Sequence, residues 1–234
     1  MGGNMLNTIL GYGQLTYAMH IGEGFLPQTW ALFWTLVFTP FLIWSIFELN
    51  RQFREDASTK LVFALMAAFA FTLSALKIPS IIGSSSHPTG MGLGAILLGP
   101  LPMVAIGTIV LILQALLIAH GGITTLGANA FSMAVVGPFV AFGIYKIMRK
   151  MNINTKVSVF AAAMIGSLST YFVTSIQLGS AFANGNFLYA TAKFLGVFMF
   201  TQLPISIAEG LLTVVVYNLL SQDNRFPRLA GGQK

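Results

Sequence analysis

The chain has 234 residues, of which 56% are hydrophobic and only 8% charged, and its formal net charge is +6. A soluble domain carries about 25% charged residues, so the composition excludes a water-soluble protein and predicts an integral membrane protein. The basic residues lie at the ends of apolar segments, where they anchor a protein to the bilayer, and they do not indicate nucleic-acid binding. The absence of cysteine excludes disulfides and thiolate metal ligands.

Residues 1–18 differ in character from the rest of the chain and are predicted to be a signal peptide or an over-extended start. They end in Thr16-Tyr17-Ala18, which fits the small-residue rule for cleavage, although a basic n-region is missing. Both interpretations make Met19 the mature first residue, and the alternative is an uncleaved tail without function. Residues 19–234 are expected to form a single membrane domain.

Met19 and His20 would form a chelator if Met19 comes first. The α-amine, the His20 amide nitrogen and the His20 imidazole can then hold one face of a transition-metal ion and leave a fourth position open. Divalent ions such as Co²⁺, Ni²⁺ and Cu²⁺ favour ligands of this type. Glu23 is near enough in sequence to be a ligand or a hydrogen-bond acceptor, and as an external carboxylate it is equally a candidate loop residue.

Long apolar segments predict membrane-spanning helices, each of which needs about 20 mostly apolar residues. In chain order, they are Trp30–Leu49, Leu61–Ile78, Leu101–Ala119, Ala128–Ile147, Val157–Leu178 and Phe194–Leu220. A shorter apolar segment, Thr89–Leu98, lies between the second and third of them, and its glycines Gly90, Gly92 and Gly94 permit close helix approach.

The basic residues set the expected orientation, since cytoplasmic loops are enriched in lysine and arginine. They mark the loops at 50–60 and 146–156 and the C-terminal tail as cytoplasmic, whereas the uncharged loops 120–127 and 179–192 are expected outside. The short segment must then cross inward. The prediction is an all-α bundle of about seven transmembrane helices, with the N-terminus outside and the C-terminus inside.

The second candidate ligand, His87, lies in Gly83-Ser84-Ser85-Ser86-His87-Pro88-Thr89-Gly90, a polar turning loop. His87 would give the fourth nitrogen, while Ser85 and Ser86 would orient the imidazoles. A histidine that caps a helix start is the alternative. The same topology puts the chain's three histidines on the external side.

His120 follows a predicted helix end, where a partly positive imidazole is favoured, so a helix-end role competes with a place on the ion path. Glu209 stands alone in the last crossing and should face the bundle interior, but its partner is not evident from the sequence. Ala64 and Ala68 have the small-xxx-small spacing of a close helix contact, within the chain or with another subunit.

Catalytic motifs are absent from the sequence: it has no GxxxxGK[ST], HExxH or GxSxG, so it is not expected to be an enzyme, and ATP-driven transport would need partner subunits. A metal-dependent intramembrane hydrolase, with His20, His87 and His120 as ligands and Glu23 as base, remains an alternative. A purely structural subunit is another.

Three separated blocks resemble one family. Met19-His20-Ile21-Gly22-Glu23-Gly24-Phe25-Leu26-Pro27, Ser84–Gly90 and Ala119–Asn129 are similar to blocks of CbiM, the cobalt substrate-capture (S) component of energy-coupling-factor (ECF) transporters. The resemblance covers about residue 19 onward. It implies that the N-terminal segment folds back into the bundle and that Met19, His20 and His87 hold Co²⁺ through four nitrogens.

The resemblance also implies the surroundings of that site and its partners. Ser85, Ser86, Glu23, His120 and Asn129 would lie around the ion or along its path, and Ala64 and Ala68 would contact a partner. The partners would be a transmembrane coupling subunit, two ATP-binding subunits and a small auxiliary membrane subunit in a prokaryotic cell membrane. The expected role is cobalt supply for cobalamin biosynthesis. Related nickel proteins usually carry aspartate at the position of Glu23, so cobalt is favoured and Ni²⁺ is the alternative.

Overall fold

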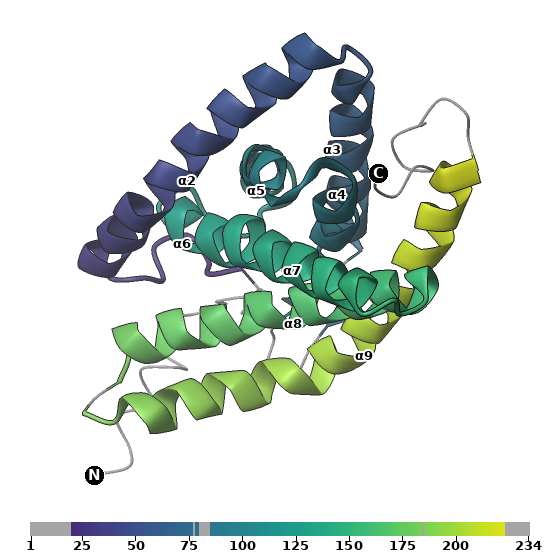
Figure 1. Ribbon diagram of the computed structural model, residues 1–234. Coiled ribbons are helices and arrows are strands. Elements are labelled where there is room, and N and C mark those ends of the chain that lie inside the picture. The colour runs from purple at the N-terminus through teal and green to yellow at the C-terminus, as the bar shows by residue number, and fades with distance from the viewer. Residues whose placement is uncertain (1–19, 77, 80–84, 184, 223–234) are drawn as a thin grey trace.

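The computed structural model describes residues 20–76, 78–79, 85–183 and 185–222, which are almost entirely helical (Figure 1). The elements in chain order are α2 (Gln28–Glu55), α3 (Thr59–Ala75), β1 (Ile78–Pro79), β2 (Ser85–Ser86), α4 (Met91–Leu98), α5 (Pro100–Ile118), α6 (Leu126–Ala130), the π-helical turn η2 (Phe131–Val136), α7 (Gly137–Lys150), α8 (Thr155–Ala181) and α9 (Phe187–Gln222). The two short strands pair antiparallel, with Ile78 opposite Ser86.

The helices form one bundle around α4 and α5. Helix α8 packs against α7 on one side and α9 on the other, while α2 and α3 cover α5 from the opposite flank (Figure 1). Met91 and Leu93 of α4 and Met103 and Ile106 of α5 are at most 1% exposed. The outward faces of α2 and α9 are instead rich in exposed large apolar side chains, as lipid-facing helices require. The predicted all-α membrane bundle is therefore confirmed.

Helix lengths agree with the membrane prediction. Among the described residues, five helices are long and apolar enough to span a bilayer, and the 17-residue α3 falls just below that length. The long ones are Gln28–Glu55, Pro100–Ile118, Leu126–Lys150, Thr155–Ala181 and Phe187–Gln222. The last contains Pro204, as the sequence indicated.

Helix α4 is too short to span a membrane alone, because eight residues rise about 12 Å. The segment from His87 to Gly99, which includes α4, nevertheless runs from one end of α5 to the other. His87 contacts His120, which follows the end of α5, while Gly99 directly precedes its first residue. The non-helical residues before α4 and α4 itself together cover the length of α5. The segment predicted to cross inward is therefore a non-helical stretch followed by a short helix, and its direction across the membrane remains a prediction.

Close packing makes this buried return possible. A Cβ on Gly92 would lie 2.8 Å from Ala163 Cα of α8, and one on Gly90 would lie 2.8 Å from Ala70 Cα of α3. Real Cβ atoms do not approach backbone atoms so closely, so neither position accepts a larger residue without movement of a neighbouring helix. The close approach predicted for these glycines is confirmed.

Some predicted boundaries were wrong. Helix α3 ends at Ala75 and not at Ile78. Ile78 precedes Pro79, and a proline ring disfavours helical backbone angles in the residue before it. Helix α9 begins at Phe187, so the predicted external loop 179–192 is largely helical.

Ala64 and Ala68 lie exposed on α3, where a partner could reach them. The sidedness of the bundle remains a prediction from charge.

Candidate metal site

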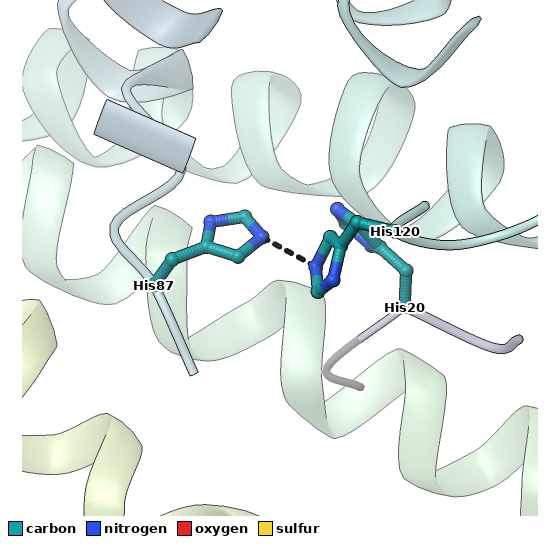
Figure 2. A group of neighbouring side chains, drawn as sticks. All are labelled: His20, His87 and His120. Atoms are coloured by element: carbon teal, nitrogen blue, oxygen red, sulfur yellow. Dashed lines mark hydrogen bonds between the residues drawn. The ribbon is translucent and has the colours of Figure 1, made fainter. Parts of the chain in front are cut away.

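Three histidines from three separate segments meet inside the bundle (Figure 2). His20 precedes α2, His87 lies between β2 and α4, and His120 follows α5. Each is at most 2% exposed, and one ring nitrogen from each lies within 4.8 Å of the others. Their ring centroids are 4.8 to 5.1 Å apart with interplanar angles of 62° to 66°, so the rings surround one point rather than stack.

The nitrogens of His87 and His120 are separated by a distance that suits an ion. Nε2 of His87 lies 3.0 Å from Nε2 of His120. Two nitrogens bound to one ion at about 2.1 Å and at right angles would stand about 3.0 Å apart. The same distance allows a hydrogen bond between the rings. The two rings are thus placed for either a shared proton or a shared ion.

His87 is oriented by its other nitrogen. Nδ1 lies 2.8 Å from the carbonyl oxygen of Pro88. A carbonyl only accepts, so Nδ1 carries a proton, and in the neutral ring Nε2 then has its lone pair on the side of His120. Metal-binding histidines typically donate their second nitrogen to a carbonyl or carboxylate in this way.

Asn129 of α6 holds the N-terminal segment next to His20. Its Oδ1 accepts from the Ile21 N–H at 2.8 Å, and its Nδ2 donates to the Ile21 carbonyl at 3.0 Å. Thr125 Oγ1 donates to the same carbonyl at 2.6 Å. The N-terminal segment therefore folds back into the bundle, as the resemblance implied, and Asn129 acts on the backbone beside His20.

Glu23 lies at the surface, in a loop contact. Its carboxylate accepts from the Thr124 N–H at 3.3 Å, and Gly24 N–H donates to Thr124 Oγ1 at 3.1 Å. Hydrogen bonding with Thr124 lowers the pKa of the Glu23 carboxyl. A Cβ on Gly122 would fall 2.5 Å from Glu23 Cα, so glycine is needed where the two loops cross. The structure thus gives Glu23 a role in docking the N-terminal segment.

The residues before α4 are held by side chains of α8 and α9. Tyr171 Oη donates to the His87 carbonyl at 3.1 Å, and the hydroxyls of Ser86 and Thr201 lie 2.9 Å apart. Glu209 accepts from Thr89 and Gly90, which gives this carboxylate of the last crossing the partners that were not evident from the sequence. No sequence pattern singled out Tyr171, because its contact joins distant segments.

Some of the predicted site residues lie outside the described part of the chain or bind other groups than the histidine rings. Met19, whose amine was the first candidate ligand, lies outside the described residues, as do residues 1–18. Ser85 is described only through its backbone pairing with Pro79, while the Ser86 hydroxyl is hydrogen-bonded with Thr201 of α9. For His120 the alternatives were a role at the helix end and a place on the ion path. In the structure its ring lies within the histidine group, next to His87.

Comparison with known proteins places the chain in a family. Residues 20–225 match the family model CbiM, described as the cobalt uptake substrate-specific transmembrane region. The chain is 56% identical over 209 residues to the cobalt transport protein CbiM of Listeria seeligeri, covering 88% of this chain and 86% of that protein. It is 58% identical over 206 residues to the CbiM of Anoxybacillus flavithermus, and this match covers 87% of this chain and 82% of that protein.

Solved structures agree with this placement. A crystal structure of a truncated transition metal transporter has a TM-score of 0.78 and 31% identity, and the match covers 88% of this chain and all of that one. A second crystal structure of a transition metal transporter gives the same TM-score at 30% identity, and this match covers 90% of this chain and 97% of that one. Together with its apolar helices, these matches show that the chain is a multi-pass protein of the prokaryotic plasma membrane and belongs to the CbiM family.

Proposed function

We propose that the protein is the substrate-binding membrane subunit of an ATP-driven, ECF-type cobalt uptake transporter that supplies cobalt for cobalamin biosynthesis. The observation that carries the proposal is the buried group of His20, His87 and His120, whose nitrogens lie within 4.8 Å of one another. Imidazole nitrogens suit divalent cobalt. The relatives are named as cobalt transport proteins, which supports Co²⁺ as the cargo.

The N-terminal amine is part of this proposal. With Met19 as first residue, its amine and the His20 amide nitrogen would join the imidazoles of His20 and His87. His120, which lies 3.0 Å from His87, would complete the surroundings of the ion or receive it on its path. Capture would need no covalent chemistry.

The proposal requires partners, because the sequence has no ATP-binding motif. A transmembrane coupling subunit, two ATP-binding subunits and a small auxiliary membrane subunit would complete the transporter. The exposed small residues Ala64 and Ala68 of α3 would contact the coupling subunit. Small residues permit the close approach that helix association in a membrane requires.

Metal binding tests the proposal directly. Cobalt content and Co²⁺ affinity would be measured on protein with a verified Met19 N-terminus, on protein with one extra residue before Met19, and on H20A, H87A and H120A. We expect about one cobalt per chain. H20A, H87A and the extended form should lose at least about tenfold in affinity, since each removes a ligand. S175A is the control: it also alters a buried polar side chain, and it should bind Co²⁺ as the unchanged protein does.

The outcomes separate the alternatives. Equal binding by both N-terminal forms would exclude the amine ligand, and tighter binding of Ni²⁺ in a competition assay would favour a nickel transporter. The position of His120 also suits a three-histidine hydrolase site with Glu23 as base. Such an enzyme would hydrolyse model peptide or ester substrates and lose that activity in E23Q, whereas the transporter should retain metal binding in E23Q, because Glu23 contacts Thr124 at the surface.

A further inference from the structure

The residues that carry His87 into the bundle have no helical hydrogen bonds of their own. This segment, Ser86–Gly90, is non-helical and mostly buried. Backbone polar groups inside a membrane protein must find partners, because no lipid group can satisfy them. The partners here are side chains of α8 and α9: Tyr171 at the His87 carbonyl and Glu209 at the next peptide groups.

Glu209 is the acidic residue most deeply placed in the described part of the chain, with 1% of its surface exposed. Oε2 accepts from the Thr89 N–H at 2.9 Å, and Oε1 accepts from Thr89 Oγ1 and from the Gly90 N–H, each at 2.7 Å. All three groups donate to the carboxylate. A buried carboxylate is costly in a membrane unless it is bound in this way.

These bonds connect Glu209 to the His87 ring through one peptide group. The Thr89 N–H, which Glu209 binds, and the Pro88 carbonyl, which accepts from His87 Nδ1, belong to the same peptide. A peptide group is planar and rigid, so fixing its N–H also fixes its carbonyl. A charged acceptor at the N–H also strengthens the carbonyl as an acceptor, because linked hydrogen bonds polarise one another.

We propose that Glu209 is a positioning residue for the metal site: through the Pro88–Thr89 peptide it fixes the His87 ring with its proton on Nδ1 and its Nε2 lone pair toward the ion. This inference rests on the proposed function. Glu209 does not contact the ion. It has the role of the carboxylate that orients a metal-binding histidine, with a peptide group inserted between carboxylate and ring. Metal sites need ligand positions accurate to about 0.2 Å, so a loose peptide group would weaken binding.

The test compares E209Q with two milder changes in the full-length protein with a verified Met19 N-terminus. E209Q keeps the shape of the side chain but replaces one acceptor oxygen by a donor. We expect Co²⁺ to bind about 10- to 100-fold more weakly, with a changed visible ligand-field spectrum. T89V removes the threonine hydroxyl but keeps the backbone N–H at position 89, so it should weaken Co²⁺ binding less than E209Q does. S206A is the control: Ser206 is buried one turn earlier on α9 and bonds only within its helix, to the Leu203 carbonyl.

A second measurement needs no variant. Nitrogen NMR of the metal-free protein, with ¹⁵N-labelled histidine, should show His87 protonated at Nδ1, and protonation at Nε2 would overturn the proposal even if E209Q fails to fold. Normal cobalt affinity and spectrum in E209Q would also overturn it. A T89V loss as large as that of E209Q would argue against the peptide route. Absence of cobalt binding in the unchanged protein would instead overturn the proposed function, and this inference with it.

Discussion

At the residue scale, the site depends on side chains that bind peptide groups near the histidines. Asn129 and Thr125 hold both polar groups of Ile21, directly after His20. Tyr171 and Glu209 do the same around His87. Ring positions are therefore determined by the backbone of two non-helical segments, and the bundle fixes that backbone through side chains of α6, α8 and α9.

The Asn129 contact gives a specific prediction. N129A would remove both hydrogen bonds to Ile21 and a longer one to Thr125, and it would leave the buried Ile21 N–H without its acceptor, which costs about 2–3 kcal/mol of local stability. We expect Co²⁺ affinity to fall at least about tenfold, because the segment carrying His20 is released. Isothermal titration would measure the affinity, and melting in detergent would measure the stability.

Ser132 provides the matched control for that change. It is buried one turn beyond Asn129, and its hydroxyl donates only to the Asn129 carbonyl. S132A should therefore bind cobalt nearly as the unchanged protein does. Equal losses in S132A and N129A would mean that general packing of this turn, and not the Ile21 contact, supports the site.

At the element scale, α4 is the helix on which the architecture depends most. It lies in the centre, between α3, α5, α7 and α8, and carries the His87 segment at its start. It packs closely against α8, where a Gly92 Cβ would meet the Ala163 backbone. The distance between these two helices leaves no room for a larger side chain.

A substitution at Gly92 tests this packing. G92L should lower the free energy of unfolding by about 1–3 kcal/mol or prevent folding, because α4 would have to move away from α8. Gly143 of α7 is the control, since a Cβ there meets no atom within 4 Å. G143A should be neutral or slightly stabilising, as alanine is the better helix former. A melting temperature unchanged in G92L would contradict the packing described for α4.

Long helices were predictable from the sequence, and the non-helical parts of the site were not. Hydropathy identified the regions of α2, α5 and α9 because a spanning helix needs a long apolar run. It placed the end of α3 too late, since local apolarity continued past Ala75. His87 was recognised as a candidate ligand, but the contact of His120 with it depends on how α4 and α5 pack, which no local pattern specifies.

At the scale of the whole molecule, orientation is the open prediction, and the cysteine-free chain makes it easy to test. Single cysteines would replace Ala57, in the turn after α2, and Ile123, in the loop after α5; both positions are exposed. A membrane-impermeant maleimide added to intact cells should label the cysteine at 123, and the one at 57 only after permeabilisation. The reverse pattern would contradict the inference drawn from the basic loops.

The histidine group also joins parts of the chain that are far apart in sequence, and this has a thermodynamic consequence. An ion held by His20, His87 and His120 would act as a reversible cross-link between three segments. Ligand that binds only the folded state stabilises it, by about 2.7 kcal/mol at 100 times the Kd. We expect cobalt to slow amide hydrogen exchange at residues 20–26 and 85–90 far more than in the outer turns of α2. Slowing that is no greater in the two histidine segments than elsewhere would contradict the cross-link.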